Sequence, residues 1–87
     1  MKIIYSRQFR KEYDKLPTLL KEGVEKKETI FRNNPFDRRL KTHKLSGQFE
    51  GFWSFSVDYR HRIIFELKSE SSVIFHIIGD HSIYKGI

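Results

Sequence analysis

Apolar and polar residues alternate along four stretches of the chain, which is the pattern of β-strands with one covered face. The first stretch is residues 2–5, KIIY, and the others cover residues 51–58, 61–68 and 72–79. The connections at Asp58–Arg60 and Lys68–Ser71 are short enough for hairpins. The pattern therefore predicts a meander of three antiparallel strands, preceded much earlier in the chain by one short strand.

Between residues 7 and 32 the apolar residues recur at helical spacing instead. Ser6 is placed to cap a first helix, whose apolar stripe consists of Phe9, Tyr13 and Leu16. Pro17 ends that helix and begins a second one, which runs from about Thr18 to Arg32. The buried stripe of the second helix is predicted to contain Leu19, Leu20, Val24, Ile30 and Phe31.

These elements predict an α+β fold with the order β-α-α-β-β-β. The two helices are expected to form an αα-hairpin that packs on one face of an antiparallel four-stranded sheet. The first strand is expected to return and pair with the three later ones. Residues 35–50 are read as a basic loop, and residues 1–87 as a single domain.

Successive side chains of a strand point to opposite faces of the sheet, which predicts where the polar ones lie. The helix-facing set is expected to be Phe55, Val57, Ile63, Phe65 and Leu67. The opposite face, expected to be uncovered, then carries Ser54, Ser56 and Arg62. The residues after the last strand, Asp80, His81 and Tyr84, emerge at its edge, and the basic loop can fold across the same rim. The pattern therefore predicts a groove around Arg62.

The composition favours a polyanionic partner. The chain has 17 Lys and Arg against 11 Asp and Glu, a net charge of +6, and an aromatic share of 15%. Basic domains with exposed rings bind nucleic acid through phosphates and stacked bases, whereas charge for solubility and rings for the core are the alternative. We expect Lys41, Lys44 and Arg60 to position phosphates, while Trp53 either packs or stacks on RNA.

Other features of the composition exclude several classes of protein. There is no cysteine, which excludes disulfides and thiolate metal sites and suits a reducing cytoplasm. No apolar run reaches the ~18 residues of a transmembrane helix. The four histidines lack the close spacing of a zinc site, so we expect no metal site.

Arginine, histidine and tyrosine around one groove would suit metal-free RNA cleavage. In that reaction the 2′-hydroxyl of the RNA attacks the adjacent phosphate, which requires a base, an acid and a cation near the phosphorane. Histidine can serve either proton role near neutral pH, and arginine can bind two phosphate oxygens at once. These residue types occur in many proteins, so spacing alone leaves this a possibility.

The segments "YSRQFRKEYDKLP", "KTHKLSGQFEGFWSFSVDYRHRIIFEL" and "IIGDHSIY" carry a resemblance to the RelE/ParE superfamily of bacterial type II toxins, and the resemblance covers nearly the whole chain. "YSRQFRKEYDKLP" is typical of the first strand and helix, and "IIGDHSIY" resembles the common G-x-H-x-x-Y ending. "KTHKLSGQFEGFWSFSVDYRHRIIFEL" resembles the L-x-G, aromatic strand and H-R pattern. "GFWS" followed by "HR" resembles the YoeB branch, and "H-x-L-x-G" the YafQ branch.

The resemblance implies a toxin that cleaves mRNA, usually in the ribosomal A site, without metal or cofactor, and that a cognate antitoxin neutralises. It implies catalytic roles for His43, Arg62, His81 and Tyr84. Arg62 matches the arginine that contacts the scissile phosphate, and His43 matches a general-base position. The lysine pair that RelE itself uses is replaced here by Trp53 and Phe55 or by Ser54 and Ser56, so the proton chemistry would rest on histidines. The toxin is expected to be a monomer that oligomerises with its antitoxin.

Two other functions stay open at this point. One is a ParE-like inhibitor of DNA gyrase without nuclease activity, although the H-x-x-Y ending argues against it. The other is an inactive relative that only binds an antitoxin. Of the two remaining histidines, His76 is interpreted as a structural residue within a strand, and His61 is expected to point away from Arg62.

Overall fold

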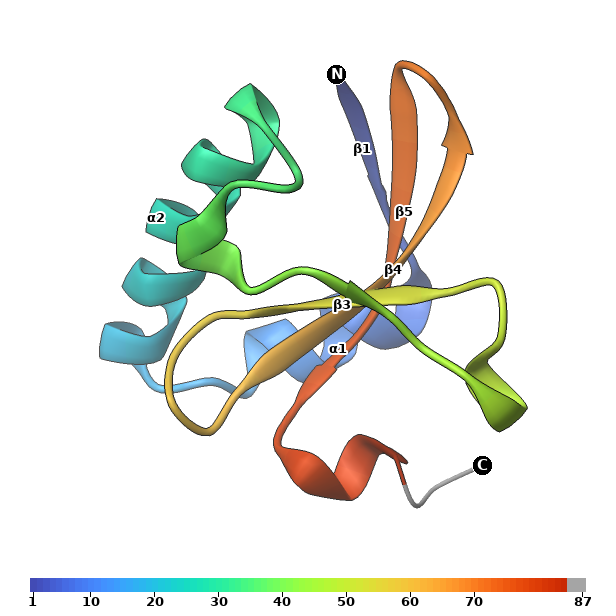
Figure 1. Ribbon diagram of the computed structural model, residues 1–87. Coiled ribbons are helices and arrows are strands. Elements are labelled where there is room, and N and C mark those ends of the chain that lie inside the picture. The colour runs from blue at the N-terminus through green and yellow to red at the C-terminus, as the bar shows by residue number, and fades with distance from the viewer. Residues whose placement is uncertain (85–87) are drawn as a thin grey trace.

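The computed structural model describes residues 1–84, which form two α-helices, five strands and three short 3-10 helices (Figure 1). The α-helices are α1 (Arg7–Asp14) and α2 (Thr18–Asn33). The strands are β1 (Lys2–Tyr5), β2 (His43–Lys44), β3 (Trp53–Ser56), β4 (Arg62–Ser69) and β5 (Ser72–Gly79). The 3-10 helices are η1 (Arg38–Leu40), η2 (Gly47–Phe49) and η3 (His81–Tyr84). The predicted order of helices and meander strands is confirmed.

The sheet has five strands in the order β1-β5-β4-β3-β2, so the expected four-stranded antiparallel sheet is wrong in two respects. First, β1 runs parallel to β5, with Ile3 beside Val73. Second, the loop before β3 contributes β2, which pairs antiparallel with β3. This pairing requires the chain to fold back between the two strands. Gly47 and Gly51 have φ angles of 63° and 95°, a conformation that glycine adopts without steric cost.

The two helices cover one face of the sheet through apolar stripes. Ser6 caps α1, because its hydroxyl accepts a hydrogen bond from the Phe9 amide at 3.0 Å. In α2, Val24 and Phe31 are buried, as the pattern predicted. Leu19, however, is 81% exposed, which corrects the predicted stripe. Neighbouring helix residues point about 100° apart, so the packing of Leu20 against the core turns Leu19 outward.

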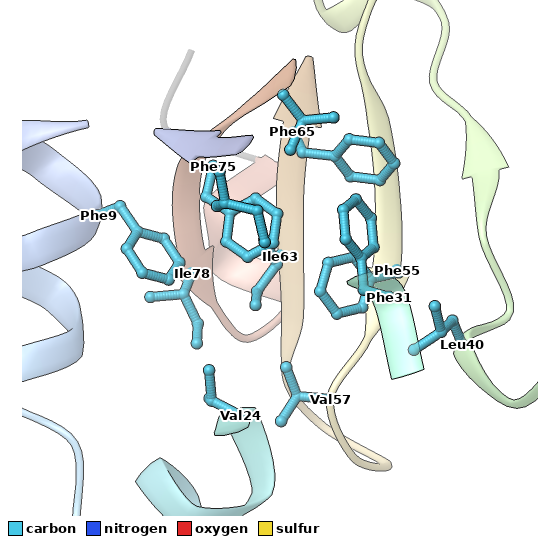
Figure 2. Packing of buried hydrophobic residues seen from close by; sticks show 12 residues of the cluster. Phe9, Val24, Phe31, Leu40, Phe55, Val57, Ile63, Phe65, Phe75 and Ile78 are labelled. Atoms are coloured by element: carbon cyan, nitrogen blue, oxygen red, sulfur yellow. The ribbon is translucent and has the colours of Figure 1, made fainter. Parts of the chain in front are cut away.

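Phenylalanine rings make up the centre of the core between the helices and the sheet. The Phe31 ring of α2 lies 5.0 Å from that of Phe55, 4.9 Å from Phe65 and 5.2 Å from Phe75, measured between centroids (Figure 2). These three rings come from β3, β4 and β5 respectively. One side chain of α2 therefore contacts all three strands of the meander. Leu67, near the β4–β5 turn, is 38% exposed and extends beyond this core.

The opposite face of the sheet is covered along part of its length, which corrects the expectation of an open face. Ile64 points away from the helices, because its neighbours Ile63 and Phe65 belong to the core, yet it is fully buried. On this side the Phe52 ring lies 5.1 Å from the His76 ring, and the Phe49 ring 5.9 Å from that of Tyr84. The segment around η2 and the residues of η3 therefore form a second, smaller apolar layer, which leaves the end of the sheet near Arg62 open.

Candidate functional site

An open depression of about 840 Å³ lies where the β3–β4 turn, the start of β4 and the residues after β5 meet. In Figure 1 both the β3–β4 turn and η3 lie at the lower end of the sheet. The lining of the depression carries two carboxylates, Asp58 and Asp80. It also carries five cationic side chains, namely Lys27, Arg39, Lys41, Arg60 and Arg62. We call it the cationic depression. An excess of positive charge in a concave surface attracts anions.

Arg62 is the first residue of β4 and lies on the face opposite the helices. It pairs with Ser56 of β3 across the sheet, and its Nη1 donates a hydrogen bond to the Ser56 hydroxyl. Ser56 is only 8% exposed, so the hydroxyl is fixed by the strand that carries it. The contact orients the guanidinium and uses only part of its donors, which leaves the others for an anion.

The β3–β4 turn is organised by Asp58. The Oδ1 atom of Asp58 accepts hydrogen bonds from the backbone N–H groups of Arg60 at 2.8 Å and His61 at 2.7 Å. The same oxygen lies 3.0 Å from the His61 ring nitrogen Nδ1. Partial burial alone would raise the pKa of the Asp58 carboxyl, but the hydrogen bonds from His61 and Arg60 outweigh it and lower the pKa. The carboxylate is therefore ionised near neutral pH, and it holds the turn that presents Arg60 to the depression.

The residues after β5 complete the depression on its other side. Hydrogen bonds from Ser82, including its amide at 2.8 Å, lower the pKa of the Asp80 carboxyl and shape the start of η3. His81 lines the depression and is exposed. Tyr84 lies outside the lining, with its ring edge-on to Phe49. The structure thus brings Arg62 and His81 to one depression, and it places Tyr84 on the adjoining apolar layer.

His43 lies on β2, is exposed, and is also outside the lining of the depression. Its Nδ1 lies 3.2 Å from the carbonyl oxygen of Lys41, a residue in the left-handed conformation with φ of 53°. A carbonyl oxygen only accepts hydrogen bonds, so Nδ1 carries the proton in the neutral ring and Nε2 is left as the acceptor. That Nε2 lies 3.5 Å from the hydroxyl of Ser54, which is fully buried.

Ser54 and Ser56 are therefore two anchors on one face of β3. Residues two apart on a strand are separated by about 7 Å. One hydroxyl contacts the imidazole of His43 and the other the guanidinium of Arg62. The sequence pattern placed both serines beside Arg62, but it could not show that each contacts a different candidate residue.

No family model matches the sequence, and no curated protein matches it. Several solved structures are similar to this chain. A YoeB/ParE toxin from Agrobacterium tumefaciens has 18% sequence identity and a TM-score of 0.80, over 93% of this chain and 99% of that one. YafQ from E. coli has 22% identity and a TM-score of 0.75, over 98% of each chain. The toxin–antitoxin complex YoeB–YefM from Staphylococcus aureus contains a chain with 15% identity and a TM-score of 0.76, over 93% of this chain and 97% of that one.

The chain has a RelE-like fold. At these identities the likeness establishes the arrangement of the elements, and the chemistry of the site has to be argued from its own residues.

The four predicted RNA-binding residues separate into two groups on the RelE-like fold. Lys41 and Arg60 line the cationic depression. Lys44 and Trp53 lie outside the lining of the depression. The Lys44 Nζ is 5.5 Å from the centre of the Trp53 ring. The Trp53 ring packs edge-on to Phe36 at 5.1 Å and against the core, in agreement with the packing alternative for this residue.

Among the lining residues that the sequence pattern did not assign to the groove are Lys27, Arg39 and Tyr59. Lys27 lies on helix α2, far from the strands in the sequence, and only the tertiary structure brings it to the depression. The guanidinium of Arg39 makes two hydrogen bonds of 3.0 Å with the Asp37 carboxylate, and these bonds lower the pKa of Asp37 to about 2. Tyr59, in the middle of a predicted turn, gave no signal beyond its residue type.

Among residues 1–84, no three His, Asp or Glu side chains gather closely enough to hold a metal ion. None of the helices in this range has the length and apolar character required to cross a membrane.

Proposed function

We propose that this chain is the toxin of a type II toxin–antitoxin pair and that it cleaves mRNA on the ribosome without a metal or cofactor. The observation that carries the proposal is the geometry at Arg62, a guanidinium anchored by a buried serine inside a cationic depression with His81 at its side. The resemblance of the three sequence segments and the RelE-like fold support it.

The proposed reaction is an internal transesterification. The 2′-oxygen of one nucleotide forms a bond to the adjacent phosphorus, and the bond from phosphorus to the 5′-oxygen of the next nucleotide breaks. One proton leaves the 2′-hydroxyl for a base, and another passes from an acid to the departing 5′-oxygen. The products are a 2′,3′-cyclic phosphate and a 5′-hydroxyl, and the protons balance.

Within this scheme Arg62 stabilises the extra negative charge on the phosphorane, where preorganised donors contribute most to the rate. His81 is proposed as one proton-transfer group, because it lines the same depression. His43 is proposed as the second, with its Nε2 available to accept a proton. Tyr84 is proposed to complete the site from η3. Lys41 and Arg60 would position neighbouring phosphates.

A cognate antitoxin in the cytoplasm is the proposed protein partner. Several of the similar structures are complexes with antitoxins, among them DinJ–YafQ and YoeB–YefM. An acidic segment of such a partner would suit the net charge of +6 of this chain. The toxin itself is proposed to be a monomer.

The test is primer extension on transcripts after induced expression of the chain and of single variants. Arg62→Ala and His81→Ala are expected to reduce cleavage by roughly 10²- to 10⁴-fold, because each removes a group that acts on the transition state. Arg38→Ala is the matched control, since Arg38 lies on η1 but does not line the depression. Circular dichroism of each purified variant would establish that the fold is kept.

Full cleavage by both the Arg62 and the His81 variants would refute the proposed mechanism. Growth arrest with intact transcripts and damaged DNA would instead indicate a ParE-like inhibitor of gyrase. Growth without any effect on RNA or DNA would leave only the binding of an antitoxin.

A further inference from the structure

Tyr59 has a large aromatic side chain that the structure leaves almost entirely in solvent. It lies at the tip of the β3–β4 turn and is 93% exposed, more than any other large hydrophobic residue among residues 1–84. At the same time it belongs to the lining of the cationic depression. A tyrosine in such a position is available to a ligand that occupies the depression.

The hydrogen bonds of the turn hold the backbone that carries this ring. The Val57 amide donates to the carbonyl of His61 at 2.9 Å, which closes the turn at its base. Inside the turn, the Asp58 carboxylate accepts hydrogen bonds from the backbone amides of Arg60 and His61, the two residues that follow Tyr59. The backbone on both sides of Tyr59 is therefore held by the turn, and the ring projects from it.

The surroundings of the ring indicate the kind of ligand. Four cations share the lining with Tyr59 in addition to Arg62, namely Lys27, Arg39, Lys41 and Arg60. An apolar partner surface would be poorly matched by so many charges, because each would have to lose water on binding. A single strand of RNA matches both features, since its phosphates pair with cations and every base offers a flat face for stacking.

We infer that Tyr59 is a stacking platform for a nucleobase of the RNA strand whose phosphate Arg62 holds. This inference rests on the proposed function, because it assumes that the depression binds RNA. Stacking on one ring is tolerant of base identity, so Tyr59 would fix the position of the strand rather than select its sequence. It would act on binding, and Arg62 on the chemical step.

Binding can be measured apart from cleavage with a fluorescein-labelled ten-nucleotide 2′-O-methyl RNA, which lacks the attacking hydroxyl. Fluorescence anisotropy would compare the wild-type protein with Tyr59→Leu, Tyr59→Phe and Tyr59→Trp. The leucine variant is expected to bind roughly five- to 150-fold more weakly, the range that stacking of one base implies. The Phe and Trp variants keep a ring and should stay within about threefold of the wild type.

A scan with single abasic nucleotides gives the same test from the RNA side. At one position the missing base should weaken binding to the wild-type protein by a similar factor. The Tyr59→Leu protein should be insensitive to the missing base at that position. This coupling is specific to a contact between ring and base, and a general loss of stability would not produce it.

Equal binding by the wild-type and leucine proteins, absence of coupling at every abasic position, or absence of binding by the wild type would each overturn the inference. So would an unchanged RNA affinity combined with weakened binding of an antitoxin, which would assign Tyr59 to a protein interface. The proposed function is judged separately by transcript cleavage. RNA binding that depends on Tyr59, without cleavage of transcripts, would refute the proposed nuclease activity and support the stacking role. Full cleavage by a Tyr59→Leu protein with unchanged RNA affinity would refute the stacking role alone.

Discussion

Gly79 is the last residue of β5, and the side chain of Ile83 from η3 packs directly over it. A Cβ added at Gly79 would lie 2.3 Å from Ile83 Cγ2 and 3.8 Å from Ile83 Cβ. Ordinary contacts begin at 3.4 Å, so the Ile83 methyl would have to move by roughly 1 Å. The φ angle of Gly79 lies outside the left-handed region, and an alanine there would therefore meet a steric rather than a backbone conflict.

The displacement caused by Gly79→Ala should reach the site and largely spare the core. His81 lies between Gly79 and Ile83 in the chain, so a shift of η3 moves its imidazole relative to Arg62. Overpacking of this kind costs about 1–3 kcal/mol where the neighbour cannot move, and less where η3 yields. A misplacement of about 1 Å can reduce a catalysed rate by ~10²-fold. We therefore expect a folded protein whose cleavage of RNA is much reduced.

A second substitution makes the reasoning testable within the same assay. Ile83→Ala removes the methyl that clashes and keeps the Cβ at its ordinary distance of 3.8 Å. The double variant Gly79→Ala/Ile83→Ala should therefore cleave RNA better than Gly79→Ala alone. RNA cleavage and thermal unfolding would be measured for the wild type, both single variants and the double variant.

Two outcomes would refute this account. One is a Gly79→Ala protein with the cleavage rate of the wild type. The other is a double variant in which the losses of the two single variants simply add, since additivity means that the two positions do not interact.

Three further predictions concern hydrogen bonds. Ser56→Ala removes the hydroxyl that accepts a hydrogen bond from Arg62, and it should slow cleavage roughly five- to thirtyfold, because such a bond is worth about 1–2 kcal/mol. Ser56→Thr keeps a hydroxyl and is the control. An equal loss of cleavage in both variants would contradict the anchoring role. Ser6→Ala removes the cap of α1 and also the hydrogen bond that the Ser6 hydroxyl donates to the His76 carbonyl at 2.8 Å. It should reduce the free energy of unfolding by about 1 kcal/mol or more, seen as a melting temperature lower by about 4 °C or more, whereas an unchanged melting temperature would mean that neither bond contributes. The Asp37 carboxyl should titrate in NMR spectra with a midpoint at about pH 2, below its ordinary pKa of 3.8. A lowered pKa means that the contact with Arg39 stabilises the fold above pH 3.8, and this stabilisation is lost as the pH falls through about 2. Arg39→Gln should raise that midpoint toward 3.8, and an unmoved midpoint would rule out the pairing as its cause.

Periodicity predicted the elements whose side chains repeat over many residues. The helix stripe around Phe9 and the alternation of Ile63 with Arg62 both hold in the structure. The capping role of Ser6 was also readable, because it depends on a contact only three residues away. In such cases the contacts join residues close in sequence, so the local pattern is enough to predict them.

The misses arose where a contact joins segments that are distant in sequence. The two residues of β2 are too few to show alternation, and their strand conformation depends on pairing with Trp53 and Ser54. The alternation of β4 showed that Ile64 points away from the helices, but it could not show that Phe49 and Phe52 return to cover that face. Lys27 likewise reaches the depression only because α2 packs beside the β3–β4 turn. These side chains gave no local signal.

The parallel pairing of β1 with β5 has a practical consequence for fusion proteins. Lys2 lies beside Ser72, at the opposite end of β5 from Gly79, and eight strand residues span about 23 Å. Figure 1 shows the N-terminus at the far end of the sheet from η3. An affinity tag or a fluorescent reporter joined before β1 would therefore begin well away from His81, while one joined after the chain would follow η3 within a few residues. Reagents for the assays above should carry their label at the amino end.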